Sequence, residues 1–462
     1  MRWKTTVVLL IATIGIGAYL SLYEIRQPPP EDRARLAKQV VRLTADEVTQ
    51  LVLDLPNVKV TLSREGTTWR LAPQQLRADP ALISTLLGAL DPLIAERILS
   101  GSAESFDCAQ DSALSGVECA EQPLNPNSYG LDPAVGWMSV VSPAGPTTLL
   151  FGETTPVAGN RYVQVKGRPE IFVVSAGLFD DANQALEQFR DPLLMRVDTW
   201  QADGLTVVAA GSSFTLTRTA RAWQIASTGL TGPHPSPEQP WTDIADRGEV
   251  TALFQRIAGV SIERFLEETP LAEQVATFGF DQPRAEVTLR QKDQPPVTLF
   301  FGKPLPDNNS LLYAKRSDEP ALYAVTSANV EALVRDPHGL RSKQCFDFFT
   351  SEVTKVEVVR EQTRWLIQRS QDQWKAEGED APLDQERVEQ FLDELGDLNL
   401  SGFVDDAPAS LSAYGLDPPA GTISVWTIGE APVQRLLVGA AIDNSSNRYG
   451  RIDGRPPVVR LP

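Results

Sequence analysis

Histidine, cysteine and methionine are scarce in this sequence of 462 residues, which has two histidines, three cysteines and three methionines. Histidine is the commonest general base and metal ligand, and cysteine is the usual soft ligand of zinc. Motifs of the types G-x-S-x-G, H-E-x-x-H and G-K-[ST] do not occur either. We therefore expect no catalytic residue, no metal site and no bound cofactor.

Positive charge is also in deficit. The chain has 42 lysines and arginines against 60 acidic residues, which is a net charge of −18. An acidic surface repels phosphate, so nucleic acid is not expected as a partner. The length allows about three domains, and the apolar content of 42% lets each of them bury a core.

Two of the three cysteines, Cys108 and Cys119, lie in one polar segment. A disulfide between them would close a short loop and stabilise the fold by roughly 2–3 kcal/mol, which fits an oxidising compartment. The alternative is a pair of free thiols in the cytosol. Cys345 has no obvious partner and is expected to be buried.

Near the N-terminus, the segment Thr5 to Tyr23 carries no charge. As a helix it would span about 28 Å, close to the thickness of the hydrocarbon core of a bilayer. The pattern favours an uncleaved signal-anchor over a cleaved signal peptide. We expect residues 1–26 to form a transmembrane anchor with a cytoplasmic tip, residues 27–42 to be a proline-rich and charged linker, and the body to be periplasmic.

The rest of the chain repeats one pattern three times. Each copy opens with an aromatic residue followed by glycine, at Tyr129, Phe278 and Tyr414. Each then reaches a glycine after an apolar run, for which we expect a turn with positive φ. These closing glycines are Gly152, Gly302 and Gly439.

Upstream of each opening motif, a tryptophan follows residues that alternate between apolar and polar. Alternation with period two predicts a hairpin with one buried face. The tryptophans are Trp69, Trp223 and Trp374, and an arginine stands five residues before each, at Arg64, Arg218 and Arg369. The tryptophans are either core anchors or platforms for sugar stacking, and the arginines either cover the sheet or bind a carboxylate.

A helix is predicted after each hairpin, with apolar residues at i, i+3, i+4 and i+7. Four residues before each set stands an aspartate that can cap the helix N-terminus, namely Asp79, Asp246 and Asp384. The three apolar sets are Ile83, Leu86, Leu87 and Leu90; Val250, Leu253, Phe254 and Ile257; and Val388, Phe391, Leu392 and Leu395.

These elements predict three tandem β-β-α-β-β-β-β modules of the α+β class, with antiparallel sheets. Their expected bounds are residues 43–192, 193–342 and 343–462. The first module carries an insertion at 103–128 and the second one at 226–245, which holds His234 and Trp241. A similar Arg-Asp-Pro sequence, at 190–192 and 335–337, follows the first two modules.

The order of motifs resembles the bacterial DUF4340 family, a domain of unknown function. The residues concerned are Thr61-Leu62-Ser63-Arg64, Gly66, Trp69-Arg70-Leu71, Tyr129-Gly130-Leu131-Asp132-Pro133 and Leu150-Phe151-Gly152. The resemblance covers about residues 40–462. It implies an envelope protein that accompanies ABC-type transport components of the gliding-motility kind, and it supplies no catalytic residues.

Three functions remain open. The first is a non-enzymatic, membrane-anchored scaffold or accessory subunit of an ABC-type system, with the permease or an auxiliary component as its partner. The second is an extracytoplasmic glycan- or peptide-binding protein, suggested by the aromatic residue in the insertion at 226–245. The third is a hydrolase with paired carboxylates, although acidic pairs such as Asp405-Asp406 are expected by chance in so acidic a chain.

Overall fold

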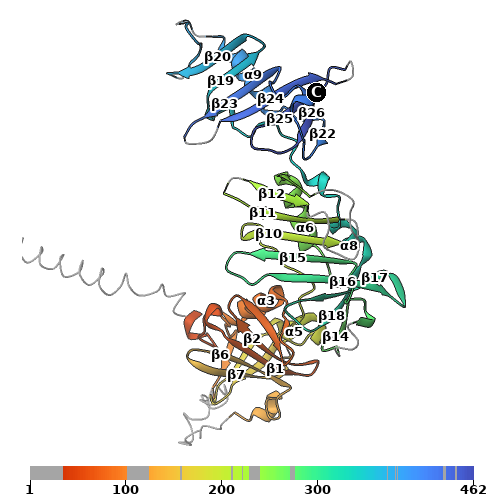
Figure 1. Cartoon of the computed structure of the whole chain (residues 1–462). Helices are drawn as coiled ribbons and strands as arrows, with labels where there is room; N and C mark the ends of the chain where they lie inside the picture. Colours follow the sequence, from red (N-terminus) through yellow and green to blue (C-terminus); the bar gives the residue numbers. More distant parts are fainter. Residues whose placement is uncertain are drawn as a thin grey trace, which may run out of the picture. The chain divides into compact units, whose positions relative to one another are not determined.

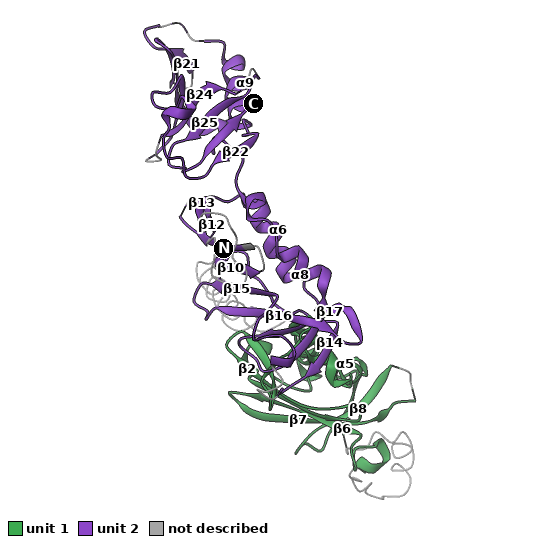
Figure 2. Cartoon of the chain, turned by 45° about the vertical axis from the view of Figure 1, so that its right-hand side comes forward, with its two compact units in different colours: residues 1–192 green, residues 193–462 purple. Residues whose placement is uncertain are grey.

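The computed structural model describes residues 35–100, 124–156, 159–209, 212–220, 222–227, 240–270, 276–371, 373–379, 381, 383–429, 433–442 and 445–462. The chain divides into two compact units, residues 1–192 and 193–462 (Figure 2). The first unit contains one sheet, and the second contains two (Figure 1). We refer to the three sheets with their helices as modules 1, 2 and 3.

Module 1 is built on a nine-stranded antiparallel sheet of order β4-β3-β2-β1-β6-β7-β8-β9-β5. Along β1 every second residue is buried, which is the expected pattern of a strand with one face on the core. The strands are β1 (Gln50–Leu55), β2 (Val58–Glu65), β3 (Thr68–Ala72), β4 (Leu76–Arg77), β5 (Arg97–Leu99), β6 (Gly136–Ser142), β7 (Gly145–Thr154), β8 (Asn160–Val165) and β9 (Ile171–Ser175).

Module 2 repeats this topology in the order β13-β12-β11-β10-β15-β16-β17-β18-β14. Its strands are β10 (Ala202–Ala209), β11 (Ser212–Arg218), β12 (Trp223–Ser227), β13 (Trp241–Ile244), β14 (Arg264–Glu267), β15 (Ala285–Gln291), β16 (Val297–Leu305), β17 (Asn308–Arg316) and β18 (Leu322–Thr326).

Module 3 has an eight-stranded sheet of order β21-β20-β19-β23-β24-β25-β26-β22. Its strands are β19 (Val353–Arg360), β20 (Thr363–Ser370), β21 (Gln373–Ala376), β22 (Gly402–Asp405), β23 (Gly421–Thr427), β24 (Gln434–Ala441), β25 (Arg448–Ile452) and β26 (Val458–Leu461). Among the described residues it has no counterpart of β4 and β13.

The predicted α+β class is therefore wrong, because strands dominate the described chain and form three large antiparallel sheets. The predicted order β-β-α-β-β-β-β is also incomplete. It omits the central strands β1, β10 and β19, the four-residue strands β13, β14 and β22, and the short strands β4 and β5 of module 1. The short strands have two and three residues, so pairing within the sheet determines them more than their own sequence pattern.

One helix packs on each sheet: α3 (Pro80–Leu90), α6 (Arg247–Ala258) and α9 (Gln385–Gly396). The carboxylates of Asp79, Asp246 and Asp384 accept hydrogen bonds from the backbone N–H groups of Ala81, Glu249 and Arg387. The apolar residues expected on the helix faces are buried, with one exception: Phe391 of α9 is 38% exposed.

Modules 1 and 2 each have a second covering segment after the last strand. It consists of a short helix, α5 (Gly177–Ala182) or α8 (Ser327–Leu333), followed by a 3-10 turn, η4 (Leu186–Phe189) or η5 (Pro337–Leu340). The short helix contacts the long one, and the turn contacts both the long helix and strand β2 or β11. In Figure 2, α6 and α8 follow one another on the same side of the strands.

The repeated motif brings two backbone segments into contact. Gly152 lies inside β7, where an added Cβ would be 2.2 Å from the carbonyl oxygen of Tyr129. Gly302 and Gly439 meet the carbonyl oxygens of Phe278 and Tyr414 in the same way. The expected positive φ is instead found at the glycines of the opening motifs, Gly130, Gly279 and Gly415. The closing glycines are thus needed for close backbone approach beside a β-bulge and do not form turns.

The opening aromatic residues form equivalent ring pairs in the three modules. Tyr129 packs on Tyr162 with 4.9 Å between ring centroids, and Tyr414 packs on Tyr449 at 5.1 Å. The corresponding pair in module 2 is Phe278 and Tyr313, at 4.6 Å. The motif therefore packs the segment before β6, β15 or β23 against the centre of the sheet in its module.

Several sequence expectations lie outside the described residues. They are the segment Thr5 to Tyr23, the pair Cys108 and Cys119, and His234. Within the part of the chain that the structure describes, no helix combines the length and the apolar character needed to cross a membrane.

Replacing Gly152 or Gly439 with alanine should destabilise the module concerned by about 1–3 kcal/mol, because the new methyl group must displace a backbone carbonyl. Thermal and denaturant unfolding would measure the loss. Gly88→Ala is the matched control, since Gly88 lies in α3 with nothing within 4 Å of an added Cβ. That control should be stabilising or neutral. Equal behaviour of the three variants would contradict the close-approach explanation.

Candidate functional site

The most concentrated polar site among the described residues lies between modules 2 and 3, around the carboxylate of Asp243. This residue is in β13, and its side chain is 0% exposed. Arg341 donates from Nε to Oδ2 at 2.9 Å. Arg455 donates from Nε to Oδ1 at 2.7 Å and from Nη2 to Oδ2 at 2.9 Å. One buried carboxylate is thus held by two guanidinium groups.

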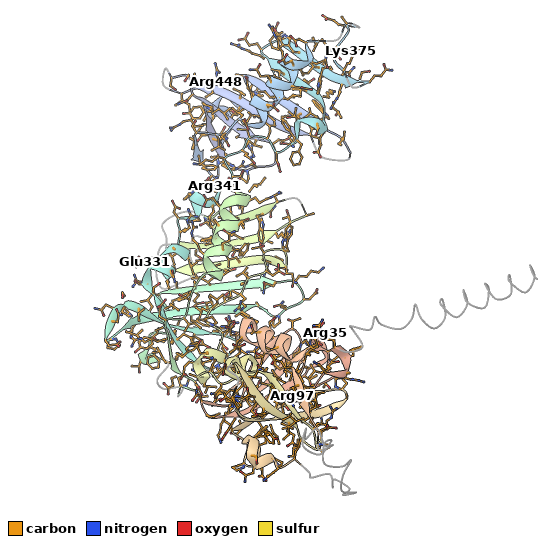
Figure 3. The ribbon with its side chains drawn as sticks, turned by 180° about the vertical axis from the view of Figure 1, so that it is seen from behind. Arg35, Arg97, Glu331, Arg341, Lys375 and Arg448 are labelled. Carbon is orange, nitrogen blue, oxygen red and sulfur yellow. The ribbon has the colours of Figure 1, made fainter. Side chains whose placement is uncertain are left out.

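Arg341 lies where the chain passes from module 2 to module 3 (Figure 3). Its guanidinium is 4.5 Å from the ring centroid of Trp241 and 3.5 Å from that of Phe403. These rings belong to β13 of module 2 and β22 of module 3. Planar guanidinium groups stack on aromatic faces, so Arg341 fills the space between the two rings and connects the modules by contact as well as by charge.

Two further groups complete the surroundings of Arg341. Its Nη2 forms an ion pair of 2.7 Å with Oδ1 of Asp406, whose side chain is 28% exposed. Its Nη1 is 3.3 Å from Nδ1 of His338, and the His338 ring stacks on Trp241 with centroids 4.8 Å apart. His338 is therefore half-buried in this site.

Arg455 comes from the turn after β25 and binds backbone as well as Asp243. It donates to the carbonyl oxygens of Ser342 at 2.8 Å and Gln344 at 3.1 Å. The side chain is only 4% exposed. A guanidinium with five donors in a rigid plane suits this combination of one carboxylate and two carbonyl groups. Arg455 of module 3 therefore binds the connecting segment through Ser342 and Gln344. It also binds module 2 through Asp243.

The charges of this site, which we call the Asp243 joint, balance. Asp243 and Asp406 are opposed by Arg341 and Arg455, so no net charge is removed from water. A buried ion pair contributes little stability compared with apolar packing, but removal of one partner leaves a charge without compensation. The Asp243 joint therefore specifies one arrangement of modules 2 and 3 and disfavours others.

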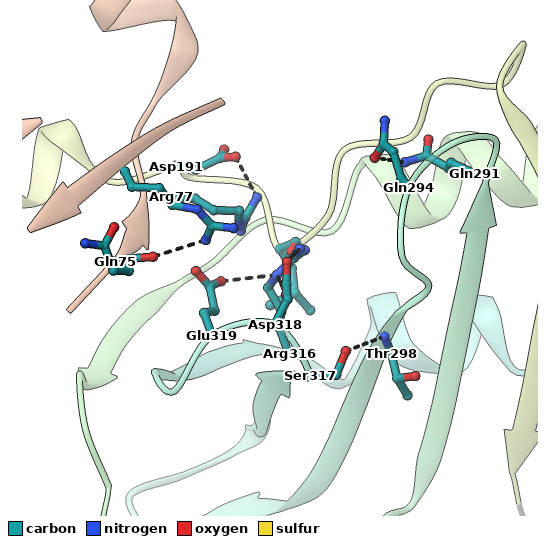
Figure 4. Close-up of polar contacts among 12 residues, drawn as sticks. Gln75, Arg77, Asp191, Gln291, Gln294, Thr298, Arg316, Ser317, Asp318 and Glu319 are labelled. Carbon is teal, nitrogen blue, oxygen red and sulfur yellow. Dashed lines mark hydrogen bonds and ion pairs between the residues drawn. The ribbon is translucent and has the colours of Figure 1, made fainter. Parts of the chain in front are cut away.

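A related clamp exists within module 1. Arg77 of β4 forms a 2.7 Å ion pair with Asp191, and both side chains are at most 10% exposed (Figure 4). Backbone bridges pair Ala78 with Arg190 and Ala245 with Arg341. Arg190 and Arg341 are thus equivalent, and the sequence-based match of Arg190 with Arg335 is wrong. The corresponding pair in module 2 is Asp243 and Arg341, so the acid is on the strand and the arginine on the later segment. Each of these residues lies one position before the equivalent of Arg77 or Asp191.

Each module also uses an arginine to hold the segment that leads into it. Arg168 donates to the carbonyl oxygen of Val40, Arg316 to that of Leu194 and Arg455 to that of Gln344. Arg316 is 6% exposed and is balanced by Asp318 and the fully buried Glu319 (Figure 4). These buried charged side chains in the described chain therefore bind other segments of the same chain.

Cys345 follows the Asp243 joint in the chain and is a free, buried thiol. Burial raises the pKa of this thiol to about 11, although the nearby Arg455 acts in the opposite direction. The thiolate is the nucleophilic form of cysteine, so this group is protonated and unreactive at neutral pH. It has the properties of a core residue.

The tryptophans of the repeat lie at the core side of the hairpins. Trp69 is 7% and Trp374 is 3% exposed, while Trp223 is half-buried with its ring 5.3 Å from Phe254. Trp241, the aromatic residue that suggested glycan binding, is 5% exposed inside the Asp243 joint. The structure does not bring any of these four rings together into an open platform.

The arginines of the repeat bind backbone carbonyl groups in the described chain. Arg64, Arg218 and Arg369 each donate from Nη1 to a backbone carbonyl just before the first strand of their module. The acceptors are Asp46 at 2.7 Å, Trp200 at 2.9 Å and Ser351 at 3.1 Å. They fix the start of each sheet, a role that the sequence analysis did not foresee.

The residues of the Asp243 joint were also missed, although one signal was present. In the sequence Trp241-Thr242-Asp243-Ile244, the alternation of β13 puts Asp243 on the buried side with Trp241. The equivalent position in module 1 is Leu76. A carboxylate in the place of a core leucine requires a buried cation, but the sequence does not reveal that Arg455 supplies one. The adjacent pair Asp405-Asp406 likewise has specific partners, since Tyr414 donates to Asp405 at 2.6 Å.

Comparison with known proteins matches three regions of this chain, residues 112–244, 235–379 and 375–462, to the family described as "Domain of unknown function (DUF4340)". No curated protein sequence matches the chain. A structure of a putative DNA polymerase III beta subunit from Eubacterium rectale aligns with 7% identity and a TM-score of 0.21, over 92% of this chain and 94% of that one.

A DNA polymerase sliding clamp from Pseudomonas aeruginosa aligns with 6% identity and a TM-score of 0.15, over 93% of this chain and 94% of that chain. TM-scores of this size do not establish a common fold, and neither alignment bears on the function of this protein.

Asp243→Ala should open the Asp243 joint, because it leaves the buried Arg455 without a counter-ion and Arg341 with Asp406 alone, at a cost of about 3–5 kcal/mol. Hydrogen exchange at the amides of Ser342 and Cys345, which are bonded to Ile244 and Leu398, would report the lost protection. Asp307→Ala is the control, since it removes an exposed ion pair with Arg264. Unchanged exchange in the Asp243 variant would refute this role of the carboxylate.

In a variant with Cys108→Ser and Cys119→Ser, alkylation of Cys345 at pH 8 should be at least roughly 200-fold slower than that of an ordinary thiol. The reason is that a thiol with a pKa of about 11 is far less ionised than one near 8.5. The rate should rise with pH towards that value and become normal in denaturant. Alkylation at the ordinary rate in the native protein would contradict the burial of this thiol.

Proposed function

The chain belongs to the DUF4340 family, whose function is unknown, and from this premise we propose that it is a non-enzymatic scaffold of the bacterial envelope. In this proposal it works as an accessory subunit of an ABC-type transport system and presents its modules on the periplasmic side of the cytoplasmic membrane. The partner is the permease or another component of that system.

The observation that carries the proposal is the use of charge in the Asp243 joint. An enzyme site needs polar groups that are free to meet a substrate, with pKa values suited to proton transfer. In this joint, the buried carboxylate and both guanidinium groups are bound to other parts of the same chain. Such an arrangement supports a role in holding two modules in one orientation, as a scaffold requires.

Large exposed apolar side chains on the second unit give this proposal further support. Trp200 is 84% exposed, Phe349 is 73% exposed and Ile428 is 60% exposed. Aromatic side chains are enriched among the residues that dominate protein–protein interfaces. Exposed aromatic residues on a scaffold whose buried charged groups bind within the chain are typical of a protein that binds other proteins.

Affinity purification of the tagged full chain from detergent-solubilised membranes should enrich an ABC-type permease or its ATP-binding subunit. Asp243→Ala should lower that enrichment by disordering modules 2 and 3, whereas Asp307→Ala should not. Quantitative mass spectrometry against an unrelated tagged membrane protein gives the baseline. Repeated purification of the intact chain without any transport component would count against the proposal.

A further inference from the structure

Module 3 leaves open a face that the other two modules cover. In module 1 this face contains Leu53, Val60 and Leu86, which are 1%, 6% and 0% exposed. Strand pairing places Leu53 opposite Val60, as it places Val358 opposite Trp365 in module 3. Trp365 is 53% exposed, so the same strand position is buried in one module and open in another.

The set in module 2 behaves like that in module 1. Val207, Phe214 and Leu253 are all 0% exposed, and Val207 pairs with Phe214. The third member of the set in module 3 is Phe391 of α9, at 38%. Three modules of one topology thus differ at one face, and only module 3 exposes it.

The covering segments explain the difference. In module 1, Phe179 of α5 and Phe189 of η4 are 5% and 0% exposed, and they come ten residues apart. In module 2, Val330 of α8 and Leu340 of η5 are 2% and 0% exposed at the same spacing. In module 3 the described residues leave Trp365 and Phe391 at 53% and 38% exposed, without an equivalent pair over them.

Backbone groups mark the same position. The N–H groups of the helix-capping Asp79 and Asp246 donate at 2.8 Å to the carbonyl oxygens of Phe189 and Leu340, at the end of each covering segment. Asp384 caps α9 in the same way, but among the described residues no such carbonyl accepts from its N–H group. Module 3 therefore has a backbone donor, the Asp384 N–H group, and an exposed apolar face at the place where modules 1 and 2 bind their covering segments.

Arg448 indicates what this segment would carry. It donates to the carbonyl oxygen of Gly439, as Arg161 does to that of Gly152 in module 1. The Arg161 guanidinium lies 3.7 Å from the ring centroid of Phe179, which belongs to the covering helix. Arg448, which is labelled in Figure 3, makes the equivalent backbone contact in module 3.

We propose that module 3 binds a short amphipathic helical segment of a partner protein on the face formed by Val358, Trp365 and Phe391. The segment supplies an aromatic residue in its helix for Arg448 and a second large apolar residue about ten positions later, in the manner of Phe179 and Phe189. This inference rests on the proposed scaffold function and names the surface that it would use. The apolar area and the Asp384 N–H would then be covered as in modules 1 and 2.

A labelled peptide with the sequence of residues 176–191 is the probe for this face, titrated into the full chain and followed by fluorescence anisotropy. It should bind saturably, and Trp365→Ala and Phe391→Ala should each weaken binding about tenfold or more. Trp200→Ala, which removes a more exposed ring elsewhere, should have no effect. A peptide with Phe179→Ala and Phe189→Ala should not bind.

Radical footprinting of the unmutated chain provides a second readout that does not depend on how the variants fold. The peptide should protect Trp365 and Phe391 and leave Trp200 and Phe349 reactive. Absence of saturable binding, or binding that does not protect Trp365, would overturn the proposal. So would self-association of the chain that Trp365→Ala abolishes, because a second copy would then occupy the face. No transport component takes part in this experiment, so its failure and a failed purification are independent results.

Discussion

A carboxylate that is removed from water is tolerated only where cations and donors replace its hydration. Asp243 satisfies this condition with groups that come from two modules, since Arg341 ends module 2 and Arg455 belongs to module 3. If the two modules separated, Asp243 would lose Arg455, and Phe403 would leave the ring stack on Arg341. The orientation of modules 2 and 3 is therefore coupled to the burial of one charge, and the arrangement is specific even where its net stabilisation is modest.

The threefold repeat shows how a common scaffold is adapted at single positions. The buried place that holds Leu76 in β4 of module 1 holds Asp243 in β13 of module 2. The glycine contacts with the carbonyl groups of Tyr129, Phe278 and Tyr414 remain the same in all modules. The backbone contacts that define the module are the same in all three copies. The side chains of its edge strand differ between modules according to their neighbours.

Local sequence patterns predict local structure well in this chain. The tryptophan hairpins and the capped helices α3, α6 and α9 lie where alternation and i, i+3, i+4, i+7 spacing indicate them. The short helices α5 and α8 have too few residues for such a pattern, and the fold class was misjudged because short and central strands were not counted. The Asp243 joint could not be predicted, because Asp243 and Arg455 are 212 residues apart and no local pattern links them.

Equivalent positions in a repeat also reveal what a single module cannot. Half-exposed Phe391 would be unremarkable on an isolated helix, since single exposed apolar residues are common on protein surfaces. It becomes informative because Leu86 and Leu253 occupy the same place and are fully buried. The same comparison holds for Trp365 against Val60 and Phe214. In modules 1 and 2 this surface is covered by a short helix and a turn. A partner of module 3 is therefore expected to present the same kind of segment.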